Sequence, residues 1–168
     1  LNSTPEAIRF YSDKFRLNKA LLKQGLPAPH TELCILEEGL DAAFKAVEAV
    51  GLPAVFKPAD GAGCSGLSFV ERVDQIPQAF MKIKEASREG RYLVQEFVSG
   101  VDASVSLMCS GGGEAQALTL NLQRLRVEGP EKVSGYFGGV VPLIHKQAED
   151  AFTLAESSVE IFPGLWGY

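Results

Sequence analysis

A glycine-rich hexapeptide preceded by a lysine is the part of this sequence best suited to binding an anion. The segment Gly61-Ala62-Gly63-Cys64-Ser65-Gly66 holds three glycines, and Lys57 stands four residues before the first of them. Glycines let the backbone approach a ligand closely and offer its N–H groups to phosphate oxygens. The pattern predicts a phosphate site. Two plainer alternatives stay open: the glycines form a flexible hairpin, and the lysine reaches solvent from the end of a strand.

The elements on either side of the glycines narrow the class of phosphate loop. Residues 54–57 and 67–70 both read as short strands, so the loop joins strand to strand. A dinucleotide-binding fold needs such a loop to open a helix, and a Walker loop ends in Gly-Lys-Ser or Gly-Lys-Thr. A protein kinase carries its lysine after the loop and has His-Arg-Asp and Asp-Phe-Gly motifs, which are absent here. None of these three classes fits.

Three other polar residues are candidates, each with a structural alternative. Lys14 falls in the first turn of a predicted helix, where the macrodipole disfavours a cation; either Asp13 neutralises it or an anionic ligand explains it. Arg124 follows alternating leucines on one strand face, where a guanidinium could hold a substrate carboxylate or simply lie at the surface. His145 precedes the last predicted helix and is a candidate either for contact with substrate or phosphate or for a capping role.

The order of the predicted elements divides the chain into two parts. Helices are expected over 12–25, with Ser12 as N-cap, and after Asp74 as the next N-cap, and the apolar stripe of 40–50 predicts another that Gly51 closes. Strict alternation beyond residue 100 predicts long strands, and a last helix is expected over about 146–161. We therefore expect an α+β (α/β) fold with a small lobe at 1–98, part of a sheet-rich lobe at 99–168, and a ligand cleft between them.

Composition excludes several kinds of partner. A net charge of −5 argues against a nucleic-acid footprint, and no apolar run is long enough for a membrane span. Three cysteines without paired spacing favour reduced thiols and hence a cytoplasmic location. The sequence begins at Leu1 and ends abruptly at Tyr168, from which we expect a fragment that is incomplete at both ends.

Together these features resemble the ATP-grasp superfamily. Ser12-Asp13-Lys14 resembles its first phosphate-binding lysine region, Val55-Phe56-Lys57-Pro58 its second lysine strand, and Val94-Gln95-Glu96-Phe97-Val98-Ser99-Gly100-Val101-Asp102 its hinge. The resemblance implies that both lysines hold the α- and β-phosphates and that the glycine loop closes over the β/γ end. It also implies that the carbonyl of Glu96 and the N–H of Val98 contact adenine within the hinge stretch from Gln95 to Val98, and that Asp102 holds the ribose. Two positions depart from the family, since Gln95 stands where Glu is common and Asp102 is shorter than the usual Glu.

The implied activity is an ATP-dependent carboxylate–amine (or carboxylate–thiol) ligase that works through an acyl phosphate. Small-molecule carboxylate and amine substrates, ATP and Mg²⁺ (or Mn²⁺) follow from the resemblance. The family's metal motif, Glu-x-Asn, is absent because none of the three asparagines has Glu two positions before it, so the metal ligands are expected beyond Tyr168. As given, the chain is expected to bind nucleotide weakly without turnover.

A narrower likeness is to archaeal tyramine–glutamate ligases of methanofuran biosynthesis. It rests on Ser104-Val105-Ser106-Leu107, Leu120-Asn121-Leu122-Gln123, Tyr136-Phe137-Gly138-Gly139 and Gly164-Leu165-Trp166-Gly167-Tyr168. The alternatives of a non-catalytic nucleotide-binding module and of a structural or interaction domain stay open, as does homo-oligomer formation.

Overall fold

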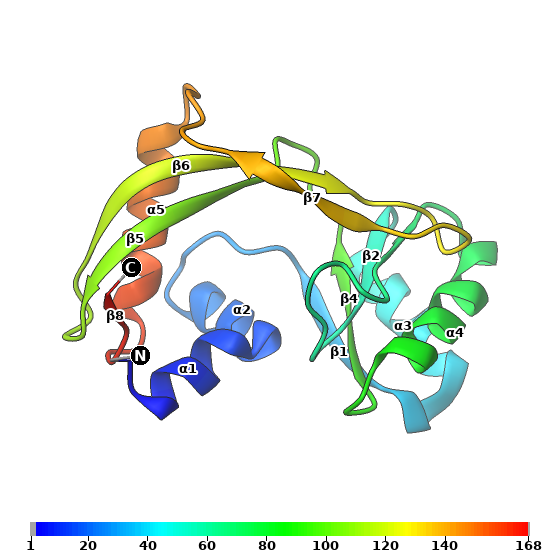
Figure 1. The fold of residues 1–168 in the computed structure, drawn as a ribbon. Coiled ribbons are helices and arrows are strands. Elements are labelled where there is room, and N and C mark those ends of the chain that lie inside the picture. The colour runs from blue at the N-terminus through cyan, green and yellow to red at the C-terminus, as the bar shows by residue number, and fades with distance from the viewer. Residues whose placement is uncertain (1–2, 168) are drawn as a thin grey trace. The chain divides into compact units, whose positions relative to one another are not determined.

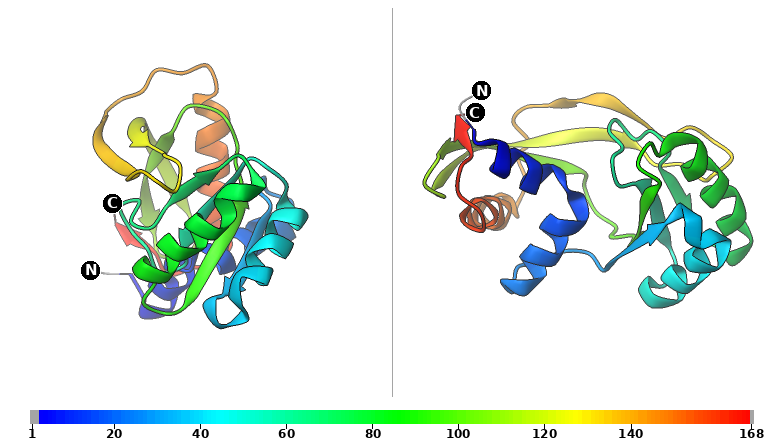
Figure 2. Two further views of the ribbon diagram at one scale, coloured as in Figure 1. Left: turned by 90° about the vertical axis from the view of Figure 1, so that its right-hand side faces the viewer. Right: turned by 90° about the horizontal axis from the view of Figure 1, so that it is seen from below.

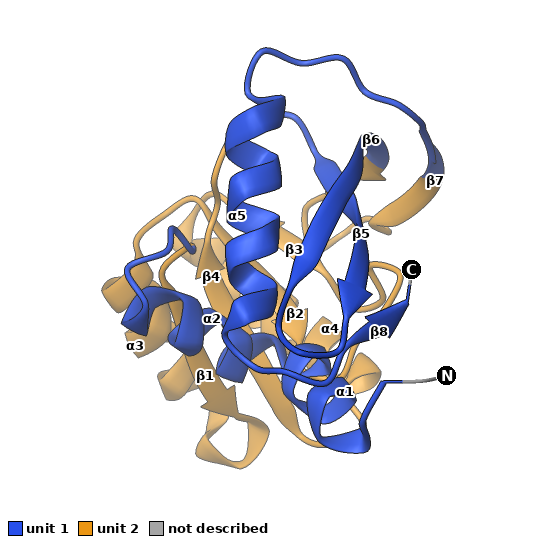
Figure 3. Cartoon of the chain, turned by 90° about the vertical axis from the view of Figure 1, so that its left-hand side faces the viewer, with its two compact units in different colours: residues 1–28, 101–124, 138–168 blue, residues 29–100, 125–137 orange. Residues whose placement is uncertain are grey.

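The computed structural model describes residues 3–167 and divides the chain into two compact units, each made of segments distant in sequence (Figure 3). Unit 1 comprises Leu1–Ala28, Val101–Arg124 and Gly138–Tyr168, and unit 2 comprises Pro29–Gly100 and Leu125–Phe137. The expected lobes at 1–98 and 99–168 are each continuous in sequence. Each observed unit instead combines segments from both of these ranges.

Unit 2 is built on an antiparallel sheet with the order β1-β4-β2-β3 (Figure 1). Its strands are β1 (Thr31–Ile35), β4 (Arg91–Glu96), β2 (Ala54–Pro58) and β3 (Ser68–Val70), and the helices that share its core are α3 (Gly39–Val50) and α4 (Ile76–Ala86). Alternation along the strands buries Phe56, Tyr92 and Val94 against these helices. Lys57 and Gln95 therefore lie on the opposite face of the sheet.

The two predicted helices of unit 2 are present, but one begins differently. Helix α3 ends at Val50, and Gly51, with φ 84°, is its C-cap, so Gly51 closes the helix as predicted. Helix α4 is preceded by a 3₁₀ turn, η2 (Val73–Gln75), and its N-cap is Gln75, so the prediction of Asp74 as N-cap was wrong. The Gln75 side chain accepts the backbone N–H groups of Glu71 and Arg72, which fixes the 3₁₀ turn first. A second 3₁₀ turn, η1 (Leu36–Glu38), precedes α3.

The described residues of unit 1 form three helices and most of a second sheet. The helices are α1 (Pro5–Ser12), α2 (Lys14–Lys23) and α5 (Ala148–Glu160), and the sheet order is β7-β6-β5-β8 with β7 (Gly135–Val140), β6 (Ala115–Arg126), β5 (Ala103–Ser110) and β8 (Trp166–Gly167). Ser12 ends α1 and does not cap α2, contrary to the prediction. The N-cap is Asp13, because its carboxylate accepts the N–H groups of Phe15 and Arg16.

Helix α1 lies close to the C-terminal end of α5 (Figures 1 and 2), and aromatic side chains join the two helices. Tyr11 Oη lies 2.8 Å from the carbonyl of Val159 and 2.9 Å from that of Phe162 at the end of α5, and Phe10 stacks on the Phe162 ring at 4.8 Å. These contacts explain why the first residues group with the C-terminal segment. Within residues 3–167, no helix has the length and apolarity to cross a membrane.

Candidate nucleotide-binding site

The glycine loop joins two antiparallel strands, which confirms the predicted strand–loop–strand arrangement. It leaves β2 after Pro58 and returns as β3, with Phe56 opposite Ser68 in the register. The backbone at Gly63, Cys64 and Gly66 has φ of 60°, 65° and 70°. A Cβ built on Gly66 would lie 2.6 Å from Ala86 Cβ and 2.8 Å from Pro58 Cγ. Glycine is therefore required at position 66 by both conformation and space.

The first end of the loop is anchored by Asp60. Its carboxylate accepts the N–H of Arg88 at 3.0 Å and lies 3.4 Å from the hydroxyl of Ser87, in the turn that follows α4. Slight desolvation raises the pKa of the exposed Asp60, but these hydrogen bonds together with backbone N–H groups outweigh it and lower the pKa below its ordinary value. The charged carboxylate thus ties the start of the loop to a second segment.

The other end of the loop is anchored through the carbonyl of Leu67. This oxygen accepts hydrogen bonds from Lys82 Nζ of α4 and from the buried hydroxyl of Ser134, both at 3.1 Å. The neighbouring Phe69 N–H donates to the carbonyl of Glu128 at 2.8 Å. Residues 125–137 group with unit 2 because they bond to β3 in this way. The loop is held at both ends while Ala62, Gly63 and Ser65 are exposed.

Lys57 lies half-buried on the sheet face opposite α3 and α4. Its Nζ donates a hydrogen bond of 2.7 Å to Oε1 of Gln95 on the adjacent strand β4. The strand register pairs Lys57 with Leu93, which lies two residues before Gln95 on β4. The side chains of Lys57, Leu93 and Gln95 are therefore on the same face of the sheet. Lys57 and the hinge residues predicted to meet adenine are therefore neighbours within unit 2.

The hinge is tied to the segments on both of its sides. Glu96 exchanges two hydrogen bonds with the backbone of His30: its carboxylate accepts the His30 N–H and its N–H donates to the His30 carbonyl, both at 2.9 Å. Phe97 N–H donates to the carbonyl of Pro53 at 3.0 Å. Sequence reasoning assigned Glu96 only through its carbonyl and missed this bracing role of its carboxylate, for which no local pattern gave a signal.

Val98 presents the free backbone group that the adenine assignment needs. The residue is 68% exposed, and its N–H donates no hydrogen bond to another residue of the part of the chain that the structure describes. The ring of Phe97, just before it, meets Phe69 of β3 edge-on with centroids 4.7 Å apart. An open N–H beside a pair of aromatic rings suits a planar base that accepts a hydrogen bond.

The remaining candidates belong to unit 1. Lys14 begins α2, directly after its N-cap. Asp102 is exposed just before β5, and its carbonyl accepts the Gln123 N–H at 2.8 Å. Arg124 is exposed near the end of β6. The structure thus brings together Lys57, the glycine loop and the hinge, while Lys14, Asp102 and Arg124 are in the other unit.

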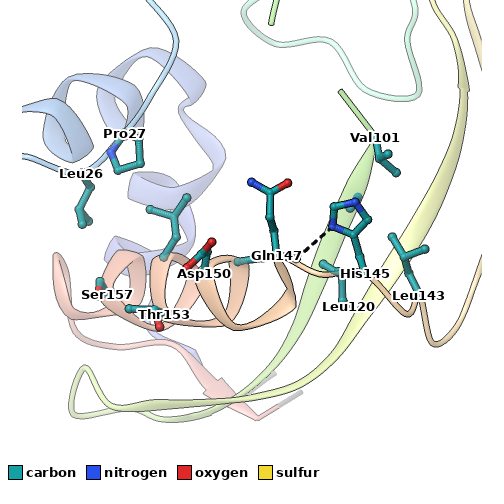
Figure 4. Close-up of a pocket in the computed structure, with 13 residues that line it drawn as sticks. Leu26, Pro27, Val101, Leu120, Leu143, His145, Gln147, Asp150, Thr153 and Ser157 are labelled. Carbon is teal, nitrogen blue, oxygen red and sulfur yellow. Dashed lines mark hydrogen bonds between the residues drawn. The ribbon is translucent and has the colours of Figure 1, made fainter. Parts of the chain in front are cut away.

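His145 lines a pocket of about 530 Å³ that lies wholly within unit 1 (Figure 4). The apolar wall comes from α5, β6 and the segments that follow α2, precede β5 and precede α5. It includes Leu26, Val101, Leu120, Leu143, Ala151 and Leu154. His145 Nδ1 accepts the N–H of Gln147, the N-cap residue of α5, at 3.3 Å. His145 therefore stabilises the start of α5 and also borders a cavity of a size that holds small molecules.

The described residues hold no cluster of metal-ligating side chains. Across residues 3–167, no group of three or more His, Cys, Asp or Glu side chains is placed to hold a metal ion. Two residues named from the sequence, Asn2 and Tyr168, lie outside the described residues. Tyr168 is the last residue of the segment Gly164–Tyr168 that resembles the tyramine–glutamate ligases. The expectation that the magnesium ligands lie beyond Tyr168 stays a prediction.

Comparison with known proteins identifies the family. The D-alanine–D-alanine ligase of Chromohalobacter salexigens is 33% identical over 126 residues, covering 74% of this chain and 34% of that protein. The D-alanine–D-alanine ligase of Xylella fastidiosa is 31% identical over 98 residues, covering 57% of this chain and 31% of that protein. The structure of VanG D-Ala:D-Ser ligase from Enterococcus faecalis shares the fold, with a TM-score of 0.74 at 18% identity over 90% of this chain and 45% of that one. The chain thus spans about a third of the length of these curated relatives. A family model described as ATP-grasp domain matches residues 11–168, and the chain belongs to this family.

Proposed function

We propose that the chain forms the nucleotide-binding part of an ATP-dependent ligase that joins a carboxylate to an amine. Membership of the ATP-grasp family and the names of its relatives, ligases of D-alanine to D-alanine, support this class of reaction. The narrower likeness to tyramine–glutamate ligases concerns the choice of substrates and stays a prediction.

The observation that carries the proposal is the line of groups along β2. The hinge lies beside the start of this strand, where Phe97 N–H meets Pro53, and Lys57 and the glycine loop lie at its end. The three residue-to-residue steps from Ala54 to Lys57 span about 10 Å of extended strand. This length is comparable with the extension of a nucleotide from its base to its phosphates. An adenine at Val98 would therefore direct its phosphates toward Lys57 and the loop.

The reaction we propose has two steps. A carboxylate oxygen of the acid attacks the γ-phosphorus, the bond to the β–γ bridging oxygen breaks, and ADP leaves. The amine nitrogen then attacks the acyl carbon, phosphate leaves, and the nitrogen gives up a proton to solvent. In the first step the protein positions the phosphates and neutralises charge; Lys57, Lys14 and the loop N–H groups would do this. We propose that Asp102 holds the ribose, that Arg124 binds the substrate carboxylate, and that His145 contacts substrate.

Titration of Mg·ATP into the chain by calorimetry tests the proposal. A hydrogen bond to a charged group contributes about 1.5–3 kcal/mol, so Lys57→Ala should weaken binding by about 10- to 150-fold. Lys84→Ala, at an exposed position of α4, is the matched loss of a lysine and should leave the affinity unchanged. Equal affinity of Lys57→Ala and the unchanged chain for Mg·ATP would exclude Lys57 from the nucleotide-binding site. Absence of Mg·ATP binding by the unchanged chain would refute the proposed function itself.

A further inference from the structure

Three side chains on neighbouring strands of unit 2 form a continuous hydrogen-bonded line across the sheet. Lys57 Nζ on β2 donates to Gln95 Oε1 on β4 at 2.7 Å, and Gln95 Nε2 donates to Thr31 Oγ1 on β1, also at 2.7 Å. The Thr31 hydroxyl donates in turn to the carbonyl of Pro29 at 2.9 Å. The register supports this line, since Gln95 pairs with Thr31 on one side and with Val55 on the other.

The chemistry of the two ends fixes the direction of every hydrogen bond in the line. An ammonium group only donates, so it requires the oxygen of the Gln95 amide. A peptide carbonyl only accepts, so the Thr31 hydroxyl must donate its hydrogen to the carbonyl of Pro29. Its oxygen then accepts a hydrogen bond from the NH₂ group of the Gln95 amide. Removing that hydroxyl leaves the amide free to turn, and a turned amide would present its NH₂ group to the ammonium.

Burial makes the hydroxyl hard to replace. Thr31 is 0% exposed, so its Oγ1 is out of contact with solvent in the folded chain. A lysine side chain loses up to about 2 kcal/mol of conformational entropy when it is ordered, and ordering it before a ligand arrives avoids that loss at the moment of binding. The group that accepts from the ammonium is the neutral amide of Gln95, which leaves the charge of the ammonium uncancelled.

We infer that Thr31 is a positioning residue for the nucleotide: it sets the Gln95 amide, which holds the Lys57 ammonium in place for the phosphates. The inference rests on the proposed function and adds a residue that makes no contact with the ligand. The sequence gives no sign of it, because Thr31 is far in sequence from both Lys57 and Gln95.

A double-mutant cycle tests the inference. Thr31→Val keeps the shape of the side chain and removes the hydroxyl; with Lys57 present, it should weaken Mg·ATP binding by about 3- to 10-fold, the effect of one ordinary hydrogen bond. Thr31→Ser should restore the affinity. In the Lys57→Ala background, Thr31→Val should cause no further loss of Mg·ATP affinity, because the ammonium group that the line positions is already absent. Thermal unfolding without nucleotide shows separately whether each variant is folded.

Several outcomes separate this inference from the proposed function. If Lys57→Ala weakens binding but Thr31→Val does not, the positioning role is wrong and the proposed function stands. Equal losses from Thr31→Val with and without Lys57 would also overturn the role, since they would indicate a general structural effect. Should Thr31→Val fail to fold, Gln95→Met breaks the same line from its middle and should show the same non-additivity with Lys57→Ala. Loss of binding that adds fully to that of Lys57→Ala would overturn the inference.

Discussion

Replacing Gly66 by alanine should destabilise the chain more than the same replacement at Gly63, three residues earlier in the loop. Both glycines have positive φ, 70° and 60°, but their surroundings differ. A Cβ on Gly63 would meet no atom within 4 Å, whereas one on Gly66 would approach Ala86 Cβ and Pro58 Cγ at 2.6 and 2.8 Å. Neither neighbour can swing away, since one is a helix Cβ and the other part of a ring.

The expected changes in the free energy of unfolding follow from the conformational cost of a positive φ and from the steric cost of the added Cβ. The left-handed conformation costs an L-residue about 1–2 kcal/mol, and the stiffer unfolded chain returns about 0.4–1 kcal/mol. Gly63→Ala should therefore lower the free energy of unfolding by about 0.5–1 kcal/mol. Gly66→Ala adds an overpacking cost of about 1–3 kcal/mol, which gives a total of about 2–4 kcal/mol.

Urea unfolding followed by circular dichroism measures both variants against the unchanged chain, and equal m-values are needed for the comparison. Mg·ATP titration of the same samples shows whether a displaced loop also loses affinity. Equal destabilisation by the two alanines would mean that the loop relaxes freely at Gly66. The contacts with Pro58 and Ala86 would then not fix its course.

Two further perturbations probe the ends and the middle of the loop. The pKa of Asp60 is lowered in the folded chain, so its carboxylate stabilises the fold above the ordinary carboxyl pKa, and this contribution is lost as the pH falls through the lowered value. The difference in unfolding free energy between the unchanged chain and Asp60→Asn should be steady from about pH 5 to 7 and shrink below about pH 4; a difference independent of pH would contradict the assigned hydrogen bonds. Iodoacetamide should alkylate half-buried Cys64 faster than Cys34, because burial raises the pKa of Cys34 to about 11, and Mg·ATP should slow the reaction at Cys64. Mass spectrometry of the two peptides measures both alkylation rates. An alkylation rate of Cys64 that Mg·ATP leaves unchanged would contradict the proposed contact between the loop and the nucleotide.

Local patterns predicted the elements that carry their own signals. The apolar stripe and closing glycine of α3, the loop between β2 and β3, and the long strands β5 and β6 all appear where periodicity and glycines placed them. Helix α1 was missed because its eight residues run directly into the cap of α2, and β1 was missed because Thr31–Ile35 shows no clear alternation. In the structure its burial is set by β4, which pairs with it from about 60 residues away.

The parts of the site that escaped sequence reasoning depend on contacts between distant segments. Nothing near Leu67 indicates that Ser134 and Lys82 bond to its carbonyl, and nothing near His30 indicates the carboxylate of Glu96. Sequence reasoning named the groups that meet a ligand, because lysines and glycines have recognisable spacings. It could not name the groups that hold those residues in place.

The core and the site of unit 2 are two faces of the same strands, and this links stability to binding. On β2, Phe56 is buried against the helices, while Val55 and Lys57 point the other way. Because side chains alternate strictly, a shift of one residue in the pairing of β2 with β4 would put the ammonium into the core and Phe56 onto the nucleotide face. The buried packing of Phe56 against Tyr92, with ring centroids 6.2 Å apart, thus enforces the register that sets Lys57 beside Gln95. The position of the cation is determined as much by the aromatic core behind the sheet as by the hydrogen bonds in front of it.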